Sequence, residues 1–72
     1  MKLKYDQEVD VLLIELREGA YANSEEVAPG MIVDFDEQGQ PLRIEILNAH
    51  DILDMEGGFK LEVLPVILKQ SA

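Results

Sequence analysis

The most specific chemical pattern in the sequence is an acidic run with the spacing of a calcium loop. Residues 34–39 read Asp-Phe-Asp-Glu-Gln-Gly, and Glu45 stands at the twelfth position, as in the D-x-D-x-polar-G-x5-E pattern. A loop of this kind lies between two helices, whereas the residues around this run alternate as strands do. Pro41 also occupies the eighth position, where an aliphatic residue belongs. We therefore expect no calcium ion at this run.

The only histidine, His50, is the side chain best suited to acid or base catalysis near neutral pH. Its polar neighbours in the chain are Asn48, Asp51 and Asp54. The spacing places no nucleophile and no second base beside it, and the only serines are Ser24 and Ser71. A solvent-exposed histidine in the first turn of a helix accounts for the same pattern. We favour that interpretation and assign His50 no catalytic role.

The remaining candidate groups are adjacent or closely spaced pairs. Glu25-Glu26 and Asp6-Asp10 are more typical of solvated charge and turn capping than of a catalytic acid and base. Gly57-Gly58 follows the expected helix, and no Lys-Ser or Lys-Thr completes a phosphate loop. The sequence therefore predicts no catalytic, cofactor-binding or metal-binding residues, and no cofactor.

A first β-hairpin is expected over residues 1–16. Apolar and charged residues alternate over residues 1–6, and an apolar run at residues 11–16 follows a polar turn. One register brings the apolar side chains together on one face. It pairs Tyr5 with Leu12, Leu3 with Ile14 and Met1 with Leu16.

The strongest strand signal in the chain predicts a second hairpin, with residues 31–36 and 42–46 on either side of a turn at Gln38-Gly39. On the apolar face the expected register pairs Phe35 with Leu42, Val33 with Ile44 and Met31 with Ile46. On the other face it pairs Asp34 with Arg43. Asp34 and Glu45 then share this outer, solvated face, two rungs apart.

The other segments complete a small domain of the α+β class that is mainly β. Residues 17–30 read as a connection with a short edge strand at 24–27. Asn48 is the expected cap of a short helix over residues 48–57. Residues 58–72 read as an edge strand or an arm, because Pro65 cannot donate to a central ladder. We expect one domain over residues 1–72, with an antiparallel meander sheet of four to five strands over residues 1–47.

Length and charge restrict the partners of this chain. Its 72 residues carry 15 acidic and 6 basic side chains, a net charge of -9, and no cysteine. So acidic a chain is unsuited to nucleic acid or to an anionic membrane surface. No apolar run approaches the ~20 residues that span a bilayer, and the first residues have no secretory signal pattern. We expect a cytoplasmic protein that self-associates as a dimer, because a short chain without disulfides buries a small core.

The chain resembles the small prokaryotic family called domain of unknown function 2283. The matching residues in the first hairpin are Tyr5-Asp6, Glu8, Asp10, Leu12, Ile14 and Leu16. Further matches are residues 24–30, which read Ser-Glu-Glu-Val-Ala-Pro-Gly, residues 32–37 with Gly39, and residues 44–47. The resemblance covers about the first two thirds of the chain and implies a mostly antiparallel domain without an established activity. Some family members resemble neighbours of small basic toxins, which implies an antitoxin-like role as one alternative.

Composition and patterning favour a non-enzymatic interaction or structural module, with a basic protein as the partner that its charge would attract. One alternative is an antitoxin-like partner of a small basic toxin. Another is a small-molecule or metal-binding enzyme subunit that uses Asp34, Glu45 or His50. That second alternative predicts a concave pocket on which these three side chains converge.

Overall fold

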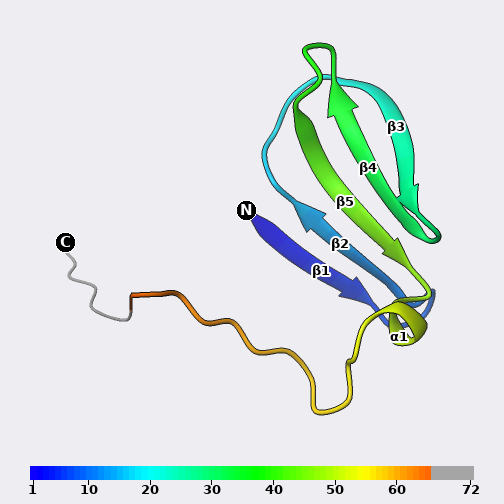
Figure 1. Cartoon of the computed structure of the whole chain (residues 1–72), viewed down its shortest axis with the longest axis vertical. Helices are drawn as coiled ribbons and strands as arrows, with labels where there is room; N and C mark the ends of the chain where they lie inside the picture. Colours follow the sequence, from blue (N-terminus) through cyan, green and yellow to red (C-terminus); the bar gives the residue numbers. More distant parts are fainter. Residues whose placement is uncertain (66–72) are drawn as a thin grey trace.

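The computed structural model describes residues 1–65, which form one five-stranded antiparallel sheet and one short helix (Figure 1). The elements in chain order are β1 (Lys2–Asp6), β2 (Val11–Glu15), β3 (Tyr21–Ala28), β4 (Met31–Asp36), β5 (Pro41–Leu47) and α1 (Ala49–Ile52). The α+β class, the antiparallel sheet and the single short helix predicted from the sequence are confirmed. None of the helices described is long and apolar enough to cross a membrane.

The order of the strands differs from the expected meander. The sheet runs β1-β2-β5-β4-β3, so β5 inserts between β2 and β4 and the chain crosses from β2 to the far edge before it enters β3. The three interior places go to β2, β5 and β4, and the nearly fully buried apolar side chains of the strands are Leu12 in β2 and Leu42 and Ile46 in β5. The almost wholly exposed β3 takes an edge. Apolar strands bury more surface in the middle of a sheet, which explains the order.

Both predicted hairpin registers are confirmed over the residues that form ladders, whereas the predicted pair of Met1 with Leu16 lies beyond the end of the β1–β2 ladder. Tyr5 lies opposite Leu12 and Leu3 opposite Ile14 in the first hairpin, whereas Val33 lies opposite Ile44 in the second. The one exception is Phe35, which pairs with Pro41 instead of Leu42 because the register shifts after Asp34. A shift of this kind is a bulge, which bends the strand pair and increases its twist.

The core lies on one face of the sheet, at the end where α1 packs. Leu12, Ile46 and Ala49 are buried together there, and Tyr5, Ile14, Met31, Ile44, Leu53 and Met55 pack around them. The helix is shorter than the predicted 48–57, and Asn48 makes no side-chain cap because it adopts a left-handed conformation with φ 50°. Asp10 from the β1–β2 turn takes over that role. Its backbone oxygen accepts the N–H of Ala49 at 3.0 Å, and its carboxylate accepts the N–H of His50 at 3.2 Å.

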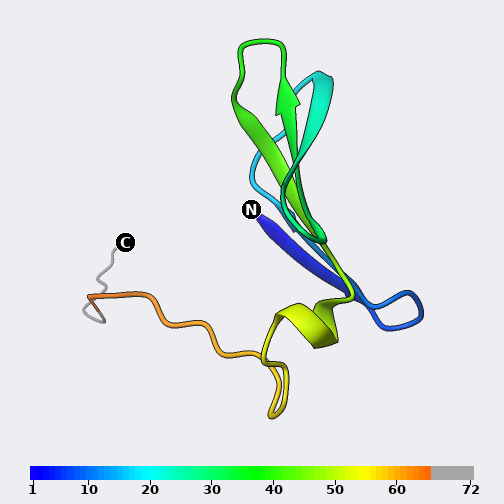
Figure 2. The same ribbon diagram turned by 45° about the vertical axis from the view of Figure 1, so that its right-hand side comes forward.

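After α1 the chain leaves the sheet as an extended segment (Figure 2). Residues 58–65 form no strand or helix, so an arm is what the structure describes in place of an edge strand. The rest of the predicted 58–72 segment lies outside the described residues.

Candidate functional site

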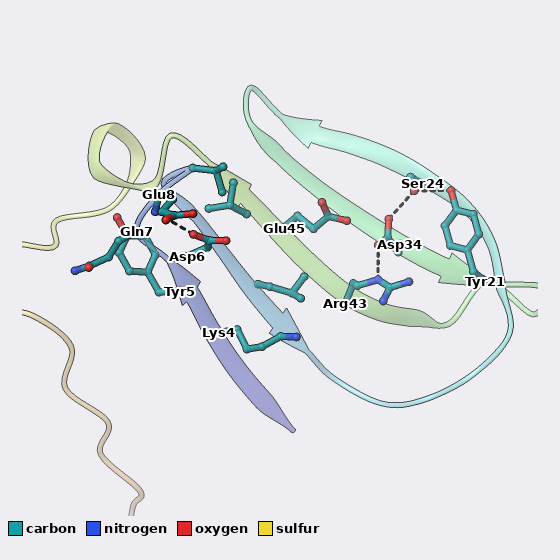
Figure 3. Close-up of a pocket in the computed structure, with 13 residues that line it drawn as sticks. Lys4, Tyr5, Asp6, Gln7, Glu8, Tyr21, Ser24, Asp34, Arg43 and Glu45 are labelled. Carbon is teal, nitrogen blue, oxygen red and sulfur yellow. Dashed lines mark hydrogen bonds and ion pairs between the residues drawn. The ribbon is translucent and has the colours of Figure 1, made fainter.

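The face of the sheet opposite the core carries an open groove with a volume of about 1150 Å³. We call it the sheet groove. Its charged lining residues are Lys4, Asp6, Glu8, Asp34, Arg43 and Glu45, and its apolar ones include Val9, Val11 and Leu13. Figure 3 shows the charged groups at two ends, with Lys4, Asp6 and Glu8 at β1 and Asp34, Arg43 and Glu45 on β4 and β5. Four acidic side chains against two basic ones make the groove a cation-attracting surface.

Asp34 is the most buried charged residue that lines the groove, at its β4–β5 end. It is only 3% exposed, which corrects the expectation that its face of the hairpin is solvated. Arg43 donates from Nε to its Oδ2 at 2.6 Å, as the predicted pairing required, and Ser24 donates to its Oδ1 at 2.5 Å. Burial raises the pKa of Asp34, but the hydrogen bonds from Ser24 and Arg43, together with one from Glu45, outweigh burial and lower the pKa below its usual value. Asp34 is therefore held as a carboxylate.

Tyr21 extends this hydrogen-bonded chain to the edge of the sheet. Its Oη lies 2.7 Å from the Oγ of Ser24, so Tyr21, Ser24, Asp34 and Arg43 form one continuous polar row across β3, β4 and β5 (Figure 3). Sequence reasoning missed Tyr21 and Ser24. Ser24 lies directly opposite Asp34 in the β3–β4 ladder. That ladder was not predicted, because the polar β3 lacks the apolar alternation that reveals a register.

Glu45 lacks the charged partner that Asp34 has in Arg43. Burial raises its pKa, and the neighbouring Asp34 raises it further, both as a hydrogen-bond partner and as a like charge. Within residues 1–65 Glu45 makes no ion pair, because Arg43 is engaged by Asp34. A cation that enters the groove beside Glu45 would relieve both effects.

A second polar cluster lies at the other end of the molecule and joins β1, the β1–β2 turn and α1. Tyr5 donates from Oη to Asp10 Oδ1 at 2.6 Å, and His50 Nδ1 lies 2.9 Å from the same oxygen. These hydrogen bonds lower the pKa of Asp10, whereas the bond to Asp10 raises the pKa of Tyr5 to about 12. His50 is exposed, as predicted. The cluster attaches α1 to the first hairpin.

The residues of the calcium-loop pattern serve the hairpin instead. Asp36 accepts the N–H groups of Gln38 and Gln40 at 2.9 and 2.8 Å, and Arg17 donates to its other oxygen at 3.0 Å. This carboxylate therefore stabilises the β4–β5 turn. Among residues 1–65 no group of three or more His, Asp or Glu side chains has the arrangement to hold a metal ion.

The predicted convergence of Asp34, Glu45 and His50 is met only in part. Asp34 and Glu45 do line one concave surface, but His50 lies in the other cluster and does not line the sheet groove. His50, the side chain best suited to acid or base catalysis near neutral pH, therefore lies outside this groove.

Comparison with known proteins identifies a family whose function is unknown. Residues 2–50 match the family described as "Protein of unknown function (DUF2283)". An uncharacterised protein of Methanocaldococcus jannaschii is 35% identical over all 72 residues of this chain. Those residues span 59% of that relative, so the chain covers little more than half of its length. No solved structure matches the chain significantly.

Proposed function

From the geometry we propose that this chain, which belongs to the DUF2283 family of proteins of unknown function, is a cytoplasmic, non-enzymatic protein-interaction module. Its sheet groove binds a basic segment of a partner protein. A lysine or arginine side chain lies with its aliphatic stem over Val11 and Leu13 and its charged end beside Glu45.

The observation that carries this proposal is the difference in compensation between two of the four groove carboxylates, Asp34 and Glu45. Asp34 already has Arg43 and Ser24 as partners, so its charge is compensated. Glu45 is half-buried beside it and makes no ion pair within the described chain, and its raised pKa reflects that cost. An incoming ammonium or guanidinium group supplies the missing charge, and hydrogen bonds to charged groups contribute about 1.5 to 3 kcal/mol.

The test is an NMR titration with an unstructured peptide that carries lysines between leucines, and with the same peptide in which glutamine replaces lysine. We expect amide shifts at Val11, Leu13 and Glu45 with the lysine peptide only. Glu45→Gln keeps the shape of the side chain and removes its charge, and should weaken binding about tenfold.

Glu37→Gln is the matched control, since it removes an equal charge from the exposed β4–β5 turn outside the groove. It should change the affinity less than twofold. Equal losses in the two variants would mean that the net charge of -9 attracts the peptide without a site, and the proposal would fail.

A further inference from the structure

The C-terminal arm, residues 59–64, has the pattern of a strand but no partner in the described chain. Phe59, Leu61 and Val63 alternate with Lys60 and Glu62, which form an ion pair with each other at 3.5 Å. Leu61 is 82% exposed and Val63 61% exposed. Exposed, alternating segments of this kind bind by adding a strand to the edge of a sheet.

The sheet offers two edges, and they differ in their fitness to accept a strand. The β3 edge is interrupted by two register shifts, which disturb the row of backbone groups that an added strand would use. The β1 edge is regular, pairs only with β2, and leaves Leu3 53% exposed. Lys2 and Lys4 on β1 repel most incoming strands, but they favour one that brings a carboxylate to the correct position.

We propose that the C-terminal arm of one copy pairs antiparallel with β1 of a second copy and forms a sixth strand there. The favoured register places Leu61 opposite Tyr5 and Val63 opposite Leu3. On the other face it places Glu62 opposite Lys4 and Lys60 opposite Asp6, so that both charged pairs have opposite signs. The register two residues away in one direction opposes Lys60 to Lys4, and the one in the other direction opposes Glu62 to Asp6.

This register continues the core of the receiving copy. Leu3 and Tyr5 belong to the face of β1 on which the core lies, since their partners Ile14 and Leu12 contribute to that core. The apolar side chains of the arm therefore extend the same face, and cover Leu3. A 72-residue chain without disulfides gains most from such added burial.

The connection holds the first residue of the arm near its own sheet and leads the rest away from it. Gly57 and Gly58 hold φ values of +88° and +86°, and the ring of Phe59 lies 6.4 Å from that of Tyr5 in the same copy. Beyond Phe59 the arm runs away from its own sheet (Figures 1 and 2). Exchange of an identical element is reciprocal, so each copy would give one arm and accept one, which closes a two-fold dimer. The groove lies on the opposite face from the added apolar side chains, so this proposal is independent of the function proposed above.

The absence of cysteine makes a disulfide test direct. Lys4→Cys and Glu62→Cys are made as separate full-length chains, mixed, and oxidised with glutathione. Residues opposite each other in an antiparallel pair have Cα atoms about 4.5 to 5.5 Å apart, within the disulfide range. We expect most of the mixed sample to form the disulfide-linked heterodimer. Lys2→Cys mixed with Glu62→Cys is the off-register control and should yield at least fivefold less.

Three results would overturn the proposal. Equal yields from the two mixtures would reject the register. In a chain that carries both Lys4→Cys and Glu62→Cys, a monomer with an internal disulfide would show that the arm folds onto its own edge. A monomeric mass by light scattering together with no cross-link would reject the exchange itself. Peptide binding in the groove is measured separately, so each of these failures is distinguishable from a failure of the proposed function.

Discussion

Asp10 is the residue at which three segments meet. It has a left-handed backbone with φ 57°, its main-chain oxygen binds Ala49, and its carboxylate binds both Tyr5 and the start of α1. An aspartate tolerates this backbone conformation better than most residues. The sequence suggested only that Asp6 and Asp10 cap turns. Asp6 does so by accepting the N–H of Glu8 at 2.9 Å, but the cap that Asp10 makes is 40 residues away in the chain and leaves no local signal.

The Tyr5 phenol should report this cluster at alkaline pH. The hydrogen bond to Asp10 raises its pKa from 10.0 to about 12 in the folded protein. The folded state thus binds the phenolic proton more tightly than the unfolded state does. The resulting stabilisation is complete below pH 10 and is lost as the pH rises toward 12. In Tyr21→Phe, where Tyr5 is the only tyrosine left, phenolate absorbance should titrate with a midpoint near 12.

Asp10→Asn in the same background is the control for this titration. It keeps the shape of the side chain but removes the charge that opposes phenolate formation, so the midpoint should fall toward 10. A midpoint near 10 in the chain that retains Asp10 would show that the hydrogen bond between Tyr5 and Asp10 does not persist in solution.

At the scale of elements, substitution of Gly30 in the β3–β4 turn and of Gly39 in the β4–β5 turn should have different effects on stability. Gly30 ends the β3–β4 turn with φ +79°, and its N–H donates to Glu26 at 3.0 Å. Gly39 in the β4–β5 turn has nearly the same φ, +80°. A side chain at Gly39 would meet no atom within 4 Å, whereas one at Gly30 would lie 2.7 Å from Cδ1 of Ile52.

Gly39→Ala should therefore cost only the left-handed backbone penalty, about 1 kcal/mol of unfolding free energy. Gly30→Ala should cost up to about 2 kcal/mol, because the end of the Ile52 side chain must also rotate away. Urea denaturation of both variants measures the difference. Equal losses would show that the Ile52 side chain rotates away without cost.

The hairpins also show how far sequence reasoning reached. Their registers followed from apolar alternation, since a slip of one residue would have exposed every apolar side chain. The pairing of β2 with β5 joins segments about 30 residues apart, and spacing alone carries no information on such a contact. The burial of Asp34 was missed for a related reason. Ser24 on β3, which lies opposite Asp34 and donates to it, belongs to the ladder that the sequence pattern did not predict.

At the scale of the molecule, basic side chains compensate the acidic ones unevenly, and the net charge is -9. Asp34 and Asp36 are buried and bound by Arg43 and Arg17, so the most deeply buried carboxylates are already compensated. The proposed attraction for a basic partner rests on less compensated side chains, of which Asp6, Glu8 and Glu45 line the sheet groove beside its apolar floor. The core is small, with four nearly fully buried apolar residues in the described chain. Such a monomer gains from its own association.

Exchange of arms makes stability depend on protein concentration. Because dimer formation is linked to folding, a tenfold increase in concentration favours the associated state by about 1.4 kcal/mol. For a domain of this size that corresponds to a rise in Tm of roughly 5 °C. Leu61→Asp places a charge at the centre of the added strand and should abolish the dependence.

The control for this last variant is Gln38→Asp, which adds the same charge to the exposed β4–β5 turn, away from β1 and the added strand. It should leave the concentration dependence of Tm intact, because the added strand is untouched. A wild-type Tm that stays constant from 5 to about 500 μM, on the order of the range in which weak dimers form, would show that the arm contributes nothing to the folded state. Association would then have to be sought on another surface, and the apolar alternation of the arm would have no structural use in this chain.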